Sequence, residues 1–188
     1  MKRRLVGVLF SLALFSAVPA LGAVVVALSV EDLTRAAPIV VHGRVGQVQV
    51  SWDDGERKIW TRAEVQVLGV VKGSPATTIL VRQPGGELGR IGQRVDGAAQ
   101  FKTGEEGVFF LEPVPDEAGV YTVFALAAGK VNFERSKVGE LRAVRHLDGL
   151  AFYALPSKKV VMPVAGLDDL GTPEAFLTRI QKAAGGAR

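Results

Sequence analysis

The chain has 188 residues, enough for one domain with a substantial core or for two small ones. Hydrophobic residues make up 48% and charged residues 22%, proportions that fit a globular protein and exclude a disordered or collagen-like one. Cysteine is absent, which excludes disulfides, thiolate zinc sites and cysteine nucleophiles. The net charge is +4, but Lys2, Arg3 and Arg4 supply three of the 23 basic residues, and the remaining 20 nearly balance the 19 acidic ones. The charge therefore does not predict a nucleic-acid partner.

Residues 1–23 have the three parts of a secretory signal peptide: a charged start, an apolar run from Leu5 to Val18, and small residues up to Ala23. Cleavage is expected after Gly22 or Ala23, with cleavage after Ala27 as another option. The alternative is an uncleaved membrane anchor, because the 26 residues between Arg4 and Glu31 carry no charge and a bilayer span needs about 20. Either reading places the folded part outside the cytoplasm, in the periplasm, on the outer surface or in the medium.

A short helix is predicted after the leader, capped by Ser29, with Asp32 as its capping-box partner, and ended by Pro38. A strand follows from Ile39 to Trp52. Its valines change parity at Gly46-Gln47, which predicts a β-bulge there.

The sequence Asp53-Asp54-Gly55-Glu56 predicts a hairpin turn, and the returning strand alternates from Ile59 to Val71. Two long, bent, paired strands favour a sheet that curls on itself. Further strands are predicted in shorter stretches: 78–82, 107–111, 120–126, 130–135, 150–155 and 160–164. Phe109, Phe110 and Leu111 form an unbroken apolar run, so we expect that strand to be buried on both faces.

A closing helix is predicted, with Thr172 as its cap, Pro173 at its first position, and Phe176, Leu177 and Ile180 on its apolar face. The expected fold is mainly β: one domain, residues 28–184, formed by a small curled antiparallel barrel with a short N-terminal helix and a C-terminal helix. A β-sandwich is the alternative.

The segments Ile39 to Val45, Thr61 to Gly73 and Val81 to Gly86, with their V-K-G and V-R-Q-P-G-G sequences, resemble an uncharacterised family of secreted bacterial proteins over residues 29–135. A more distant resemblance is to netrin-like modules and tissue inhibitors of metalloproteinases. That resemblance implies a barrel of the oligonucleotide/oligosaccharide-binding (OB) type. The inhibitors chelate zinc through an N-terminal cysteine, which this chain lacks, so their mechanism is not implied.

The loop from Gln83 to Gln100 is the best candidate for a binding surface, because long glycine-rich loops in compact domains are often functional. Arg82, Gly85, Gly86, Arg90 and Arg94 are its candidate residues, since exposed backbone N–H groups and guanidinium forks favour carboxylate or phosphate groups. The alternative is a solvated connection that binds nothing.

Trp52 and Trp60 flank the first hairpin and form a second candidate, an aromatic surface that stacks on sugars. The alternative is a cross-strand pair that stabilises the hairpin by about 0.2–1 kcal/mol. For Asp53, Asp54 and Glu56, a plain turn is favoured over a calcium loop, because the calcium-loop pattern is incomplete.

His42 and His146 are the only histidines, and structural roles are favoured for both. No serine lies in a hydrolase motif, and no cofactor or metal site is predicted. We therefore expect a non-catalytic binding or assembly protein of the bacterial periplasm or cell surface. Its partner would be a protein or acidic polysaccharide of the envelope, not nucleic acid, with membrane contact only if the leader stays attached. The alternatives are an envelope enzyme built from carboxylates and His42 or His146, and a membrane-anchored protein.

Overall fold

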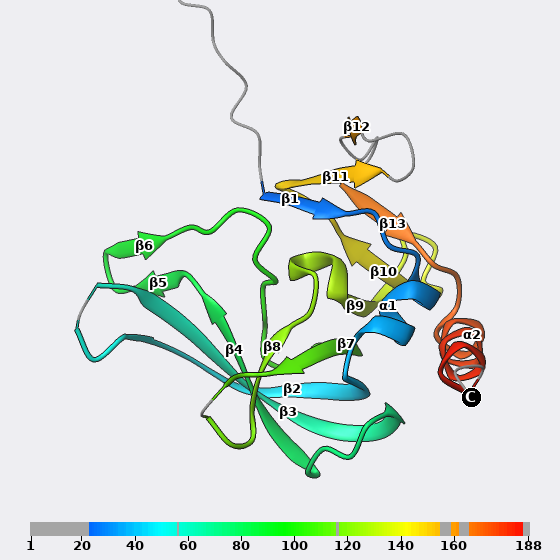
Figure 1. Ribbon diagram of the computed structural model, residues 1–188, viewed down its shortest axis with the longest axis horizontal. Helices are drawn as coiled ribbons and strands as arrows, with labels where there is room; N and C mark the ends of the chain where they lie inside the picture. The colour runs from blue at the N-terminus through cyan, green and yellow to red at the C-terminus, as the bar shows by residue number, and fades with distance from the viewer. Residues whose placement is uncertain (1–22, 56, 116, 155–158, 162–165, 186–188) are drawn as a thin grey trace, which may run out of the picture.

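The computed structural model describes residues 23–55, 57–115, 117–154, 159–161 and 166–185 (Figure 1). The leader up to residue 22, Glu56 of the first turn and the end of the strand expected at 160–164 lie outside the described residues. The strands are β1 (Ala23–Val26), β2 (Ile39–Trp52), β3 (Ile59–Lys72), β4 (Thr78–Pro84), β5 (Gly86–Leu88), β6 (Ile91–Gln93), β7 (Glu106–Pro113), β8 (Val120–Val123), β9 (Lys130–Arg135), β10 (Leu141–His146), β11 (Leu150–Ala154), β12 (Lys159–Val161) and β13 (Leu167–Asp169). The helices are α1 (Val30–Ala36), the 3-10 helix η1 (Leu126–Gly129) and α2 (Pro173–Gly185).

Five strands close a barrel in the order β2-β3-β4-β8-β7, with β7 returning to β2 (Figure 1). The predicted fold class is confirmed: the protein is mainly β, with an OB-like barrel and a helix near each end. One detail was wrong, because the β4–β8 pair is parallel rather than antiparallel. The reason is geometric: directions cannot alternate all the way around a ring with an odd number of strands, so one neighbouring pair must be parallel.

The predicted bulge in β2 is confirmed. The β2–β3 register shifts between Val45 and Val48, so that both side chains point into the barrel although they differ in parity. Further shifts occur between Val40 and Val41 and between His42 and Gly43. Bulges bend a strand and increase its twist, which allows two long strands to close a small barrel.

Strand β7 is buried on both faces, as predicted, and separates two cores. Phe109 and Leu111 point into the barrel, whereas Val108 and Phe110 pack against the helices, and all four are fully buried. The barrel core consists of Val41, Val45, Ala63, Val65, Ile79, Val81, Ala99, Phe101, Phe109, Leu111 and Val123. The outer core consists of Val30, Leu33, Ala37, Val40, Val108, Phe110, Val131, Ala143, Phe176 and Ile180.

One edge of β7 is shared by two strands: β8 pairs with its end and closes the barrel, and β9 pairs with its start. Strands β10 and β13 then extend the sheet from β9. The strand expected at 120–126 therefore ends early, at Val123. The chain must leave the barrel and return to the same edge, and it does so through η1, with Ala125 and Leu126 in the left-handed conformation (φ 59° and 57°).

Helices α1 and α2 pack side by side over the outer core (Figure 1). The predicted cap of α1 is confirmed, because the Ser29 hydroxyl accepts from the Asp32 amide. At the other end of α1, the Lys72 ammonium donates to the carbonyls of Thr34 and Arg35. An ion pair between Glu31 and Arg179 joins the two helices.

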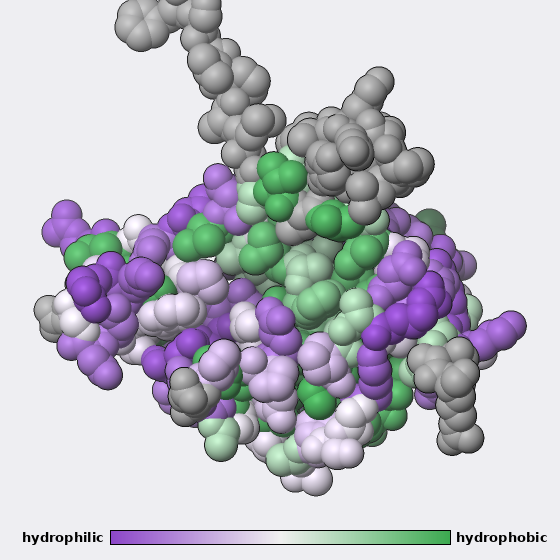
Figure 2. Space-filling model, in the orientation of Figure 1, coloured by the Kyte–Doolittle hydropathy of each residue, from purple (hydrophilic) through white to green (hydrophobic). Residues whose placement is uncertain are grey.

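Strands β1, β11 and β12 form a separate small sheet in which β1 and β11 run parallel. Val24 and Val26 on β1 are about half exposed. Figure 2 shows that hydrophobic residues gather on this side of the molecule. Strands β1, β10 and β13 were not predicted from the sequence. In the described part of the chain, no helix has both the length and the apolar character needed to cross a membrane.

Candidate functional site

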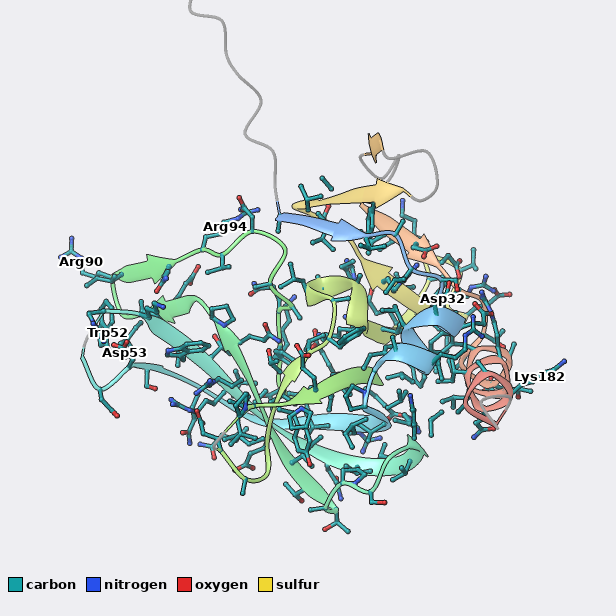
Figure 3. All side chains as sticks on the ribbon, in the orientation of Figure 1. Asp32, Trp52, Asp53, Arg90, Arg94 and Lys182 are labelled. Carbon is teal, nitrogen blue, oxygen red and sulfur yellow. The ribbon has the colours of Figure 1, made fainter. Side chains whose placement is uncertain are left out.

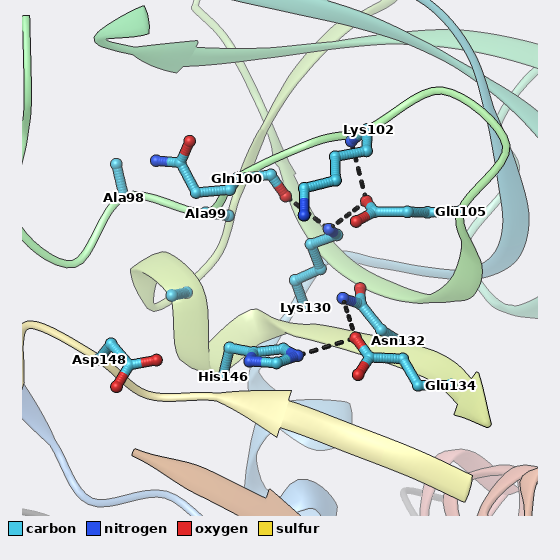
Figure 4. A pocket seen from close by; sticks show the side chains of 11 residues that line it. Ala98, Ala99, Gln100, Lys102, Glu105, Lys130, Asn132, Glu134, His146 and Asp148 are labelled. Carbon is cyan, nitrogen blue, oxygen red and sulfur yellow. Dashed lines mark hydrogen bonds and ion pairs between the residues drawn. The ribbon is translucent and has the colours of Figure 1, made fainter. Parts of the chain in front are cut away.

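Strand β9 presents a row of polar side chains on one face. Lys130, Asn132 and Glu134 alternate with the apolar residues Val131 and Phe133, which pack toward the outer core. The polar face of β9 is therefore turned away from the helices. It forms one wall of a cavity (Figure 4).

The opposite wall comes from the segment that leads into β7 and from η1. The cavity has a volume of about 530 Å³. Its lining is Ala98, Ala99, Gln100, Lys102, Glu105, Ala127, Lys130, Asn132, Glu134, His146 and Asp148 (Figure 4). This lining combines three alanines with five charged side chains, so it offers both donors and acceptors to a small ligand.

A second cavity of about 500 Å³ adjoins the first, and both are lined by Ala98, Gln100 and Asp148. The remaining lining of the second cavity is Gly86, Glu87, Gly92, Gln93, Arg94, Val95 and Gly97. We call the two cavities together the trough. It runs from the β5–β6 hairpin to the polar face of β9.

Lys130 is the most deeply buried charge of the trough, with 6% of its side chain exposed. Its ammonium donates to the Glu105 carboxylate at 2.7 Å and to the Gln100 carbonyl at 2.5 Å, and lies 5.0 Å from the centre of the Phe101 ring. Burial lowers the pKa of Lys130, and the Glu105 carboxylate only partly offsets this effect. The ion pair also ties the segment before β7 to β9.

Glu134 connects two neighbours. Its Oε1 accepts from the Asn132 amide at 2.9 Å and lies 2.8 Å from His146 Nε2. Burial raises the pKa of Glu134, but these hydrogen bonds and the nearby positive charges outweigh burial and hold the pKa below its usual range. Glu134 is therefore an acceptor at neutral pH, and its partner His146 Nε2 carries the hydrogen of their bond.

Asn132 contains an unsatisfied polar group. The residue is 8% exposed, and its side-chain carbonyl oxygen is buried without a hydrogen-bond partner among the described residues. Leaving such an acceptor unpaired costs about 1–3 kcal/mol. Asn132 lines the trough, and a donor group of a ligand or ordered water that reaches this oxygen would complete its hydrogen bonding.

The predicted loop is only partly a loop. Gln83 belongs to β4 and is buried, its amide donating to the Thr122 hydroxyl, and a β5–β6 hairpin occupies 86–93. Gly89, with φ 64°, lies at the turn of this hairpin, and a glycine at such a position is a sequence signal for a hairpin.

The five candidate residues of that loop are not brought together. Gly86 and Arg94 line the trough, and Arg94 is exposed and 3.4 Å from Asp96. Gly85 binds the first hairpin through its backbone, and Arg90 is exposed at the β5–β6 turn (Figure 3). Arg82 lies on the outer barrel wall and pairs with Glu117.

Trp52 and Trp60 do not face each other. The register places Trp52 opposite Ile59 and Trp60 opposite Ser51, so the two indoles lie on opposite faces of the hairpin. Instead, Trp60 contacts Arg82, whose guanidinium lies 4.4 Å from the ring centre. The expected aromatic pair is therefore replaced by a cation–π contact between residues from two different candidate sets.

His42 lies in β2, away from the trough lining. It pairs with Glu106 at 2.9 Å, which also pairs with Arg44, and its ring contacts Phe133. Asp53 accepts from the amides of Arg57 and Lys58, as a turn residue does. Among the described residues, no group of three or more histidines, aspartates and glutamates is placed to hold a metal ion.

Five lining residues of the trough were not predicted from the sequence: Lys130, Asn132, Glu134, Glu105 and Asp148. One signal was present: polar residues at every second position of the predicted strand 130–135 indicate a face that is not packed in a core. The partners of that face come from distant parts of the chain, which a single sequence does not bring together.

A comparison with models of known protein families finds no match, and a comparison with characterised proteins finds no significant similarity.

Proposed function

We propose that the protein is an exported, non-catalytic binding protein of the bacterial periplasm or cell surface, and that its ligand site is the trough. The observation that carries the proposal is the buried Asn132 carbonyl, which lacks a donor in the wall of a 530 Å³ cavity. Cavities of about 300–1,000 Å³ are the usual size of small-molecule sites. A ligand with a hydrogen-bond donor would satisfy this group.

The lining favours a small ligand with both donors and acceptors. The positively charged residues of the trough are Arg94, Lys102 and Lys130, and the negatively charged ones are Glu87, Glu105, Glu134 and Asp148. The two signs are mixed, so the trough does not favour a polyanion such as nucleic acid. An envelope protein or acidic polysaccharide would instead contact the exposed Arg90 and Arg94 at the hairpin.

If the leader is removed, the position of β1 favours cleavage near Ala23 over cleavage after Ala27. Strand β1 begins at Ala23 and pairs with β11 through Val26, so cleavage after Ala27 would remove a structural strand. N-terminal sequencing of protein recovered from the periplasm or medium tests this part. An intact Met1 in the membrane fraction would instead support the anchor.

The ligand site is tested by comparing how strongly small compounds stabilise the wild type and a variant in which the trough is filled. The assay measures the melting temperature with a panel of amino acids, sugars, keto acids and nucleotides. Gln100→Trp fills the trough from an exposed position, and Val138→Trp, at a residue that is 81% exposed and outside the lining, is the matched control. A compound that stabilises the wild type and Val138→Trp but not Gln100→Trp is expected. Equal stabilisation of all three proteins would place the site elsewhere.

A second candidate function, an envelope enzyme, is favoured by one observation. His146 lies in a cavity with Glu134 and Asp148, and its bond to Glu134 orients the ring as a carboxylate does for a general base. Replacing His146 by Gln separates the two functions. Loss of turnover of a panel compound with retained binding would support the enzyme, whereas binding without turnover by the wild type supports the binding protein.

A further inference from the structure

Lys130 combines three features: its side chain is deeply buried, its ammonium pairs with a carboxylate, and the residue lines a cavity. We propose that Lys130 reacts reversibly with small aldehydes or ketones that enter the trough and holds them as imines. This inference rests on the proposed function and names the chemical class of its ligand.

The neutral amine is the form of lysine that attacks a carbonyl carbon, and a lowered pKa raises its fraction at a given pH. Burial and the charge of Lys102 lower the pKa of Lys130, while the carboxylates of Glu105 and Glu134 act in the opposite direction, and the net shift is downward. Lys102 lines the same cavity but is exposed, and so serves as an internal comparison.

Glu105 is placed to handle the protons of the reaction, because its carboxylate lies 2.7 Å from the ammonium. It accepts one proton from the ammonium, and the amine lone pair forms the C–N bond to the carbonyl carbon. A proton moves from nitrogen to oxygen and gives the carbinolamine. Glu105 then returns its proton to the hydroxyl, which leaves as water, so ammonium and carbonyl become a protonated imine and one water.

The rest of the trough suits a carbonyl compound that is also hydroxylated or carboxylated. Asn132, Glu134 and Asp148 provide acceptors for hydroxyl groups, and Lys102 provides a cation for a carboxylate. The volume of about 530 Å³ leaves room for a chain of a few carbon atoms. Glyoxylate, an aldehyde with a carboxylate, is therefore a suitable probe.

The test is reductive trapping with glyoxylate and cyanoborohydride, which reduces the imine to a stable secondary amine. Peptide mass spectrometry then measures the adduct at each lysine of the full chain. At pH 7 we expect several-fold more adduct at Lys130 than at Lys102. The ratio should fall as the pH approaches 10, where exposed lysines also become neutral.

Two variants separate the failure of this inference from the failure of the proposed function. Lys130→Arg keeps the charge but forms no imine, so it should lose the adduct at this position. Lys137→Arg, at an exposed lysine outside the lining of the trough, is the control and should leave the adduct at Lys130 unchanged. Binding of panel compounds in the trough with no excess adduct at Lys130 would overturn the imine alone. If no panel compound binds in the trough and no excess adduct forms at Lys130, the proposal that the trough is the ligand site is overturned as well. If Lys130→Arg does not fold, the imine is still tested by the ratio of adduct at Lys130 to adduct at Lys102 in the wild type and by the fall of that ratio with rising pH.

Discussion

Phe109 and Phe110 are neighbours in the chain but belong to different cores, and this makes a quantitative prediction. Phe109 packs inside the barrel, where its ring stacks on Phe101 at 6.0 Å, whereas Phe110 packs between the barrel and the helices. Both are fully buried. Truncation to alanine should therefore cost about 3–5 kcal/mol of unfolding free energy in each case, from lost transfer energy and a residual cavity.

The smaller change to leucine allows the two cores to be compared in one folded protein. Phe109→Leu and Phe110→Leu should each cost about 1–2 kcal/mol. Because the β7 backbone separates the two rings, the double variant should equal the sum within about 0.5 kcal/mol. Urea denaturation of the four proteins measures this. A coupling energy above about 1 kcal/mol, or alanine variants that lose less than about 1 kcal/mol, would refute the two-core arrangement.

Other positions give further expectations. Gly107→Ala should lower the free energy of unfolding by about 1–3 kcal/mol, because the added Cβ would lie 2.0 Å from the Val131 carbonyl oxygen. Gly46→Ala is the control and should be tolerated, because the nearest atom to its added Cβ is 3.7 Å away. Equal losses in the two variants would contradict the close packing at Gly107. The pKa of Glu31 is lowered chiefly by its hydrogen bond from Arg179. The ionised Glu31 therefore stabilises the folded protein fully above the unfolded pKa of 4.5, and this contribution is lost as the pH falls through the lower folded pKa. Denaturation across pH 7 to 2 should show a weaker acid-side loss for Glu31→Gln, and an unchanged profile would exclude this contribution. Lys72→Met should lower the free energy of unfolding by about 1 kcal/mol, because the hydrogen bonds to the α1 carbonyls are lost. Thermal melting followed by circular dichroism should show a lower melting temperature, and an unchanged melting temperature would contradict a stabilising role of these bonds.

The parts of the fold that could be predicted from the sequence are those determined by neighbouring residues. The parity change at Gly46-Gln47 indicated the bulge in β2, and Ser29 with Asp32 indicated the start of α1. The unbroken run at Phe109 and Phe110 indicated a strand with two buried faces.

The parts that were missed depend on distant contacts. Strand β1 is held by β11, more than a hundred residues later in the chain, and its sequence also fits the end of a leader. The parallel β4–β8 pair follows from closing five strands into a ring.

In the candidate site too, local features could be predicted from the sequence, whereas distant contacts could not. Its polar face on β9 was visible as an alternating pattern, but Glu105, His146 and Asp148 reach it only through the pairing of β7, β9 and β10. The predicted arginines were chosen for their shared loop, and the folded chain separates Arg82 from Arg90 and Arg94 by placing it on the barrel wall. Proximity in sequence was therefore a poor guide to proximity in the site.

The most direct test of the central claim, that the trough is the ligand site, is the mapping of backbone amide chemical shifts with the panel compound that stabilises the protein most. The account predicts that the largest changes fall at 98–102, 130–134 and 146–148. Changes confined to the barrel wall around Trp60 and Arg82 would contradict it.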